Sequence, residues 1–219
     1  HSKIIDIAKI NLDDKDVFNL FSEGRTTGIF QFESDGMREY LKQLKPNSIR
    51  DLIAMNALYR PGPMANIPEF IARKNGKSKI NYIHQNLEPV LNETYGIIVY
   101  QEQVMQISQI IGGFTLAQGD MLRRAMGKKK ADVMAAFKVD FVDGAVKQNY
   151  DKKMSIEIFD LLEKFAQYGF NKSHSTAYAL IAYQTAWLKT HYPAEFMAAN
   201  LSSEVNDTDK VVKLLTSVK

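Results

Sequence analysis

The 219-residue chain contains no cysteine, and this absence excludes disulfide bonds and thiolate metal sites. A reducing cytoplasm is the location we expect for such a chain. Its four histidines, His1, His84, His174 and His191, lack the spacing of metal ligands, so the sequence does not indicate a zinc hydrolase. No apolar run is long enough to span a bilayer, and we expect neither a signal peptide nor a membrane partner.

An excess of charge of one sign is also lacking. Lys and Arg number 28 and Asp and Glu 25, which leaves a net charge of only +3. No general basic field can therefore attract nucleic acid, and any such binding must come from local clusters of cations. A hydrophobic content of 45% and a charged content of 24% are typical of a soluble globular protein. The first residue is His1 rather than Met, so we expect a fragment of a longer protein.

A carboxylate pair on an apolar strand, the usual holder of two catalytic metal ions, is missing as well. The Asp-x-Asp pairs, at Asp14 and Asp207, both open predicted helices in polar surroundings and are interpreted as helix caps. A P-loop is not indicated either, because Gly127-Lys128 is followed by neither Ser nor Thr and no strand precedes it. The sequence thus predicts no catalytic residue and no metal ligand in this chain.

Apolar periodicity predicts a mainly α fold with a few short β-strands. The expected helices cover residues 15–21, 35–44, 48–58, 64–74, 101–111, 116–126, 132–147, 155–168, 173–191, 194–203 and 207–218. Branched and aromatic residues at 27–32 and 96–100 predict two strands, which we expect to pair. Polar stretches at 74–79 and 148–153 are candidate linkers, and they suggest lobes at 1–75, 80–148 and 153–219.

Five cations fall within eight residues at the junction of two predicted helices, residues 123–130. Gly127 suits the left-handed position that follows a helix, which places Arg123 and Arg124 in the last turn of the first helix. Lys128 and its two neighbours then precede the second helix, whose positive end repels them. Phosphate is the natural ligand of such a helix start, so the junction is a candidate phosphate site.

A second junction of the same kind lies at residues 168–178. Gly169 ends one predicted helix, and Asn171 or Ser173 can cap the next. Lys172 and His174 then lie at a positive helix end, a placement that costs stability until an anion binds. One such lysine is commonly just a solvated side chain, but two similar junctions favour phosphate binding.

Three further residues complete the predicted site. Arg60 precedes Pro-Gly-Pro, a rigid turn that either ends a helix or holds the arginine toward a phosphate. Gln101 begins a helix directly after a predicted strand. Tyr178 lies four residues after His174, on the same helix face, where an aromatic ring can stack on a nucleobase.

The sequence resembles the alpha subunit of bacterial DNA polymerase III, a family C replicative polymerase. Six motifs with the family's order and spacing carry the resemblance: residues 28–34 (GIFQFES), 57–63 (ALYRPGP), 93–105 (ETYGIIVYQEQVM), 122–130 (LRRAMGKKK), 165–178 (FAQYGFNKSHSTAY) and 188–197 (LKTHYPAEFM). It extends from about Asp6 to the end and implies that the chain is most of a multi-lobed helical fingers domain. The family's catalytic aspartates lie in a palm domain that would precede residue 1.

The resemblance implies a parent protein that extends a DNA primer by template-directed nucleotidyl transfer, with magnesium as cofactor and deoxynucleoside triphosphates as substrates. Primer–template DNA and other replicase subunits would be its partners, and this chain alone would be inactive. The predicted nucleotide-binding residues are Arg60, Gln101, Arg123, Arg124, Lys128, Lys172, Ser173, His174 and Tyr178. The alternatives are a non-enzymatic helical nucleic-acid-binding module and a helical protein-interaction scaffold.

Overall fold

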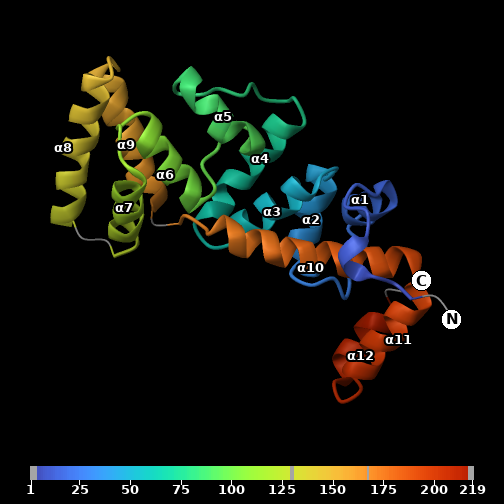
Figure 1. The fold of residues 1–219 in the computed structure, drawn as a ribbon. Helices are drawn as coiled ribbons and strands as arrows, with labels where there is room; N and C mark the ends of the chain where they lie inside the picture. The colour runs from blue at the N-terminus through green and yellow to red at the C-terminus, as the bar shows by residue number, and fades with distance from the viewer. Residues whose placement is uncertain (1–3, 129–130, 167, 217–219) are drawn as a thin grey trace. The chain divides into compact units, whose positions relative to one another are not determined.

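The computed structural model of the chain describes residues 4–128, 131–166 and 168–216, and helices dominate it (Figure 1). It divides into two compact units. Unit 1 contains His1–Tyr59 and Ser173–Lys219, and unit 2 contains Arg60–Lys172. Within the described ranges, no helix combines the length and the apolar character needed to cross a bilayer. The predicted mainly α class is confirmed.

Unit 1 is built from both ends of the chain. Its elements are η1 (Ile7–Lys9), α1 (Lys15–Ser22), α2 (Asp35–Leu44), α3 (Ile49–Leu58), α11 (Pro193–Ser203), α12 (Thr208–Thr216) and, apart from its first residue, α10 (Lys172–His191). Asp14 caps α1, because its Oδ1 accepts from the amide of Asp16 at 3.0 Å. Asp207 accepts from the amide of Lys210 at 3.1 Å at the start of α12. Both Asp-x-Asp pairs thus open helices as predicted.

A buried face of α10 holds the two ends of the chain together in unit 1. Ala179, Ala182 and Ala186 are fully buried there, and such small side chains allow close packing. Tyr183 is buried on the same helix, and its hydroxyl donates to the carbonyl of Asn11 at 3.0 Å. Burial raises the pKa of Tyr183, so its hydroxyl stays protonated and keeps this bond.

Unit 2 is a helical cluster (Figure 1). Its elements are η2 (Pro63–Asn66), α4 (Ile67–Lys74), η3 (Gln85–Leu87), α5 (Glu88–Leu91), η4 (Asn92–Thr94), α6 (Gln101–Ile110), α7 (Leu116–Lys128), α8 (Ala131–Lys147) and α9 (Lys152–Ala166). Helix α8 packs along α9, and α6 packs along α7. Phe141 joins these pairs, because its ring lies 6.0 Å from Phe114 and 5.4 Å from Phe159 between centroids.

The two predicted strands are wrong, since the described residues contain no strand and only one isolated bridge, between Tyr100 and Phe170. Residues 27–32 instead form consecutive turns, with the amide of Phe32 donating to the carbonyl of Ile29 at 3.1 Å. Positive φ angles at Gly28 (76°) and Gln31 (65°) are incompatible with a strand. The apolar pattern at 27–32 was nevertheless meaningful, because Ile29 and Phe32 are fully buried.

The second run, residues 96–100, begins in a turn at Gly96 (φ 80°), makes only the isolated bridge at Tyr100 and bonds to a side chain of α6. Oε1 of Gln103 accepts from the amides of Val99 at 2.8 Å and Tyr100 at 3.0 Å. This side chain is buried at the start of α6 and is itself anchored to Thr94 by a bond of 2.9 Å. Gln103 thus satisfies the amides of Val99 and Tyr100, which are then not available to a strand partner.

The predicted helix break at Gly127 is also wrong. Helix α7 continues through Gly127 and includes Lys128, so Gly127 does not take the left-handed position after the helix. A helical glycine costs about 1 kcal/mol relative to alanine, which the packed helix tolerates. Lys129 and Lys130 lie outside the described residues.

Both candidate linkers, residues 74–79 and 148–153, fall inside unit 2. The division between the units instead follows Tyr59 and precedes Ser173. The three lobes stay a sequence prediction.

Candidate functional site

The candidate site in unit 2 is organised by the bridge between residues 99–102 and 168–172. The amide of Gln101 donates to the carbonyl of Phe170 at 2.9 Å, and the amide of Phe170 lies 3.4 Å from the carbonyl of Val99. Nε2 of Gln101 adds a bond of 3.0 Å to the carbonyl of Gly169. The starts of α6 and α10 are thereby held side by side, although some 70 residues separate them in the sequence.

Glu102 occupies the start of α10. Its Oε1 accepts from Nδ2 of Asn171 at 2.9 Å, and both of its oxygens lie 3.0 Å from the amide of Lys172. A carboxylate at a helix N-terminus complements the positive end of the helix. The expected uncompensated dipole is therefore wrong, because the protein itself supplies the anion. Helix α10 begins at Lys172, so Asn171 rather than Ser173 precedes it.

The ammonium of Lys172 is neutralised as well. Its Nζ lies 2.6 and 2.8 Å from the two carboxylate oxygens of Glu93, and 5.4 Å from the centroid of the Tyr100 ring. An incoming phosphate must compete with Glu93 for this lysine. Such competition is feasible because the pair is only partly buried, with 37% and 24% of the two side chains exposed.

Helix α7 presents the opposite balance of charge. Arg123 donates to Oδ1 of Asp120 through Nε at 2.9 Å and Nη2 at 2.7 Å, while Nε of Arg124 lies 2.8 Å from Oδ2 of the same residue. Hydrogen bonds from Arg123, aided by the charges of both arginines, lower the pKa of Asp120 and keep it ionised. One carboxylate thus holds two guanidinium groups, and a net positive charge remains on the surface of α7.

Arg123 also contacts the bridge. Its Nη1 lies 3.3 Å from Oε1 of Gln101, whose Nε2 is bonded to Gly169. Gln101 therefore connects the arginine pair on α7 with the residues that precede α10. Gln101 and Arg123 are thus in contact, and their role in nucleotide binding stays a prediction.

Arg60 contacts the bridge as well. Its Nη2 donates to the carbonyl of Tyr168 at 2.9 Å, and its guanidinium carbon lies 4.1 Å from the centroid of the Phe170 ring. Burial lowers the pKa of Arg60, but an arginine still carries its charge at neutral pH. We name Arg60, Arg123, Arg124 and Lys172 the cationic cluster.

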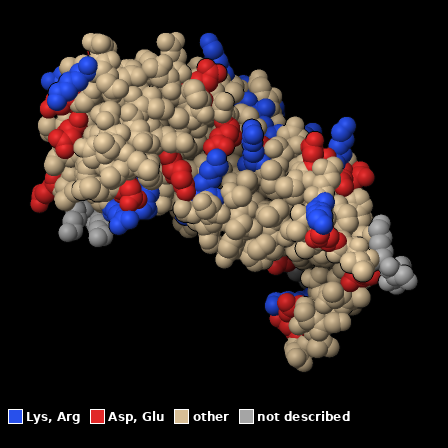
Figure 2. Space-filling model, viewed as in Figure 1, with Lys and Arg blue, Asp and Glu red and all other residues tan. Residues whose placement is uncertain are grey.

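The charges on the face in Figure 2 are mixed, with acidic and basic groups interspersed, which agrees with the small net charge. Within this mixture, the residues that set the charge of the cluster are Glu93, Glu102 and Asp120, and sequence reasoning missed their roles. Asp120 precedes Arg123 and Arg124 by three and four residues, so helical spacing alone could have found it. Glu93 gave no such signal, because it lies 79 residues before Lys172.

The remaining predicted residues belong to unit 1 or lack a described side chain. His174 stacks on Tyr178, with ring centroids 4.1 Å apart and an interplanar angle of 31°. Phe30, a residue of the loop at 27–32, continues the stack at 5.1 Å from Tyr178. Ser173 is exposed in the first turn of α10, and the side chain of Lys128 lies outside the described part of the chain.

No group of three or more His, Cys, Asp or Glu side chains suited to a metal ion occurs among the described residues. The arrangement is therefore that of a helical, polar site that positions charged groups at the starts and along the sides of helices. Its class is a helical domain with a cationic cluster beside paired carboxylates.

This chain belongs to the finger domain family of the bacterial DNA polymerase III alpha subunit, whose family model matches residues 1–149. It is 60% identical over 203 residues, or 92% of its length, to DNA polymerase III subunit alpha of Borreliella burgdorferi. The corresponding protein of Neisseria meningitidis serogroup B is 57% identical over 95% of the chain, and that of Escherichia coli K12 is 53% identical over 96%. The chain spans only 18–19% of the length of these relatives.

Proposed function

We propose that the chain forms part of the fingers of a replicative DNA polymerase and binds the triphosphate of an incoming deoxynucleoside triphosphate during template-directed synthesis. The observation that carries the proposal is the shared carboxylate of Asp120, which leaves two partly exposed guanidinium groups with one negative charge between them. Arginine forks match phosphate oxygens in geometry and in charge. The family relationship supports this use of the cluster.

Within the cluster the residues take different roles. Arg123 and Arg124 are the first contacts for phosphate, because 31% and 68% of their side chains are exposed. Gln101 positions Arg123, and Arg60 approaches the same bridge over Phe170. Lys172 binds phosphate only by leaving Glu93, so it contributes less in net free energy.

Lys128, Ser173, His174 and Tyr178 remain proposed contacts for the nucleotide or the primer–template. The ring stack of His174, Tyr178 and Phe30 suits a nucleobase, since aromatic faces stack on any base. This stack is also the observation that favours the alternative function, a non-enzymatic nucleic-acid-binding module.

Magnesium is the proposed cofactor of the longer protein, where it would neutralise charge on the transferred phosphoryl group. Among the described residues, no group of three or more His, Cys, Asp or Glu side chains is placed to hold it. The contribution of this chain is therefore to bind and orient phosphate, and we propose that the chain alone does not extend a primer. Association with other replicase subunits and a cytoplasmic location are proposed for the parent protein.

Calorimetric titration of the 219-residue chain with dATP, with inorganic tripolyphosphate and with a 20-nucleotide oligo-dT tests the proposal. Binding of dATP and tripolyphosphate is the expected result. Hydrogen exchange of the same complexes should show protected amides at residues 101–103, 120–128 and 168–172. Arg25→Ala is the matched control, because Arg25 is an exposed arginine paired with Glu23 in unit 1. Binding of oligo-dT alone would favour the nucleic-acid-binding module. If the chain binds none of the three ligands, the helical protein-interaction scaffold is the remaining alternative.

A further inference from the structure

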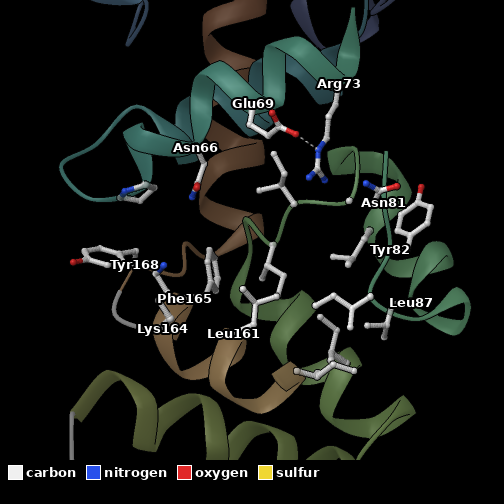
Figure 3. Close-up of a pocket in the computed structure, with 18 of the residues that line it drawn as sticks. Asn66, Glu69, Arg73, Asn81, Tyr82, Leu87, Leu161, Lys164, Phe165 and Tyr168 are labelled. Carbon is white, nitrogen blue, oxygen red and sulfur yellow. Dashed lines mark hydrogen bonds and ion pairs between the residues drawn. The ribbon is translucent and has the colours of Figure 1, made fainter. Parts of the chain in front are cut away.

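Unit 2 contains a cavity of about 600 Å³ that is separate from the cationic cluster. Figure 3 shows it between α4, the segment that carries Asn81 and Tyr82, and α9. Its volume is within the range of small-molecule sites, which is about 300–1,000 Å³. Its walls are mainly apolar, with Leu91, Ile98, Ile107, Ile158, Leu161 and Phe165 among the lining residues.

The charged groups that line the cavity are Glu69 and Arg73 on α4 and Lys164 on α9. Nε of Arg73 donates to Glu69 at 2.7 Å, and Nη1 donates to the carbonyl of Tyr95 at 3.0 Å. Nη2 of Arg73 has no described partner, and Figure 3 shows the guanidinium group pointing from α4 toward the cavity. Gly96 permits this placement, because a Cβ there would lie 2.9 Å from Nη1 of Arg73.

Aromatic rings line the cavity from two sides (Figure 3). Phe165 and Tyr168, at the end of α9 and just after it, both line the cavity, and Tyr82 lines it from the segment before α5. Flat apolar ligands gain most from such rings, because ring faces offer a large area with little loss of side-chain entropy. A single anionic group on the ligand would meet the free donor of Arg73.

We propose that this cavity is a binding site for a flat, mainly aromatic small molecule that carries one anionic group. The ring system lies against Ile107, Leu161 and Phe165, and the anion accepts from Nη2 of Arg73. Neither the family relationship nor the proposed triphosphate site assigns a ligand to this place.

Tyr168 links the cavity to the cationic cluster. Its ring lines the cavity, while its carbonyl accepts from Nη2 of Arg60 at 2.9 Å. The ring lies against Gly62, where a Cβ would be 2.3 Å from two ring carbons. A ligand that extends to Tyr168 and moves this residue also moves the carbonyl that holds Arg60, and it thereby weakens phosphate binding by the cluster. This consequence, unlike the site itself, rests on the proposed function.

The probe for the site is 8-anilinonaphthalene-1-sulfonate, compared with N-phenyl-1-naphthylamine, which has the same rings and no charge. Calorimetry should give one sulfonate probe per folded chain, bound up to about fivefold more tightly than the neutral probe at low salt. Arg73→Gln should remove this difference, whereas Arg50→Gln, at an exposed arginine of α3, should keep it. Equal affinities of the two probes for the unmodified chain would overturn the assignment of the anionic group.

Filling the cavity is the second test. Leu161→Trp places a large ring in the cavity and should lower the affinity for the sulfonate probe by at least about tenfold. Leu116→Trp is the matched control, because Leu116 is 65% exposed on α7 and does not line the cavity. Melting curves of both variants establish that they fold. Equal probe binding by the two variants would overturn the site.

The link to the cluster is tested with tripolyphosphate. Saturating probe, or Gly62→Ala, should weaken tripolyphosphate binding by a factor of about three to ten. Gly76→Ala is the control, because Gly76 also has a positive φ (69°), but a Cβ added there would meet no atom within 4 Å. If the chain binds the probe but never tripolyphosphate, the proposed function fails and the cavity site stands. If both bind without affecting each other, the link through Tyr168 is wrong.

Discussion

The start of α10 and the outer side of α7 carry the same kind of sequence signal, cations beside a helix end, yet their charge balance differs. At α10, Lys172 is paired with Glu93, and Glu102 occupies the helix start. At α7, Arg123 and Arg124 share the single carboxylate of Asp120. The first region is internally neutralised and the second keeps a net positive charge. A cation at a helix end therefore indicates an anion site only where the fold does not bring a carboxylate to it.

The strongest test of this comparison removes the cations of α7 one at a time. Arg123→Ala and Arg124→Ala should each weaken tripolyphosphate binding about ten- to a hundredfold, because a hydrogen bond to a charged group contributes about 1.5–3 kcal/mol. Calorimetry at low salt measures the loss, with Arg25→Ala as the control. Unchanged affinity in both variants would mean that the arginines only pair with Asp120.

The capping role of Glu102 predicts the next largest effect. Glu102→Ala leaves the amide of Lys172 without its acceptor and should lower the free energy of unfolding by about 1–2 kcal/mol. Urea unfolding at constant m-value measures this loss. Glu157→Ala, at an exposed glutamate of α9, should change stability little. Equal stability of the two variants would contradict the capping role.

The pair of Lys172 and Glu93 should matter less, since partly exposed ion pairs contribute about 0.2–1 kcal/mol. A double-mutant cycle with Lys172→Gln and Glu93→Gln isolates their coupling from other effects. If Glu93 competes with phosphate, Glu93→Gln should also tighten tripolyphosphate binding severalfold. A weaker affinity in that variant would show that Glu93 positions Lys172 for the ligand.

Lys189 extends the comparison to a cation that donates to backbone carbonyls, those of Arg25 at 2.9 Å and Thr27 at 2.8 Å. Burial, together with the charges of Arg38 and Arg25, lowers its pKa from 10.5 to about 8. Between about pH 8 and 10.5 the unfolded chain therefore holds this proton while the folded chain has lost it. The contribution of Lys189 to the free energy of unfolding should rise with pH across this range.

Unfolding measurements at pH 7.5, 8.5 and 9.5 test that sign, with Lys189→Met as the reference that lacks the titrating group. As the pH rises, the free energy of unfolding of the unmodified chain should increase relative to that of Lys189→Met. A difference that is constant with pH would show that the pKa of Lys189 is not lowered in the folded state.

Local sequence patterns determined most of the helices of this protein. The starts of α1 at Lys15, α2 at Asp35 and α6 at Gln101 agree with the predicted ranges. Capping residues and apolar periodicity act over one or two turns, so they can be read without knowledge of the fold. The same is true of the contact between Asp120 and the two arginines, which needs only helical spacing.

Only the tertiary structure decided the state of the second junction. Glu102 reached a helix start 70 residues away, whereas Gln103 satisfied amides three and four residues before it. The contact of Glu102 depends on how distant segments pack, and the contact of Gln103 is local. Electrostatic balance falls steeply with distance and burial, so it is set by three-dimensional neighbours. The sequence by itself therefore determined the helices, the cations and the family of this chain, while the fold decided which cations keep an uncompensated charge.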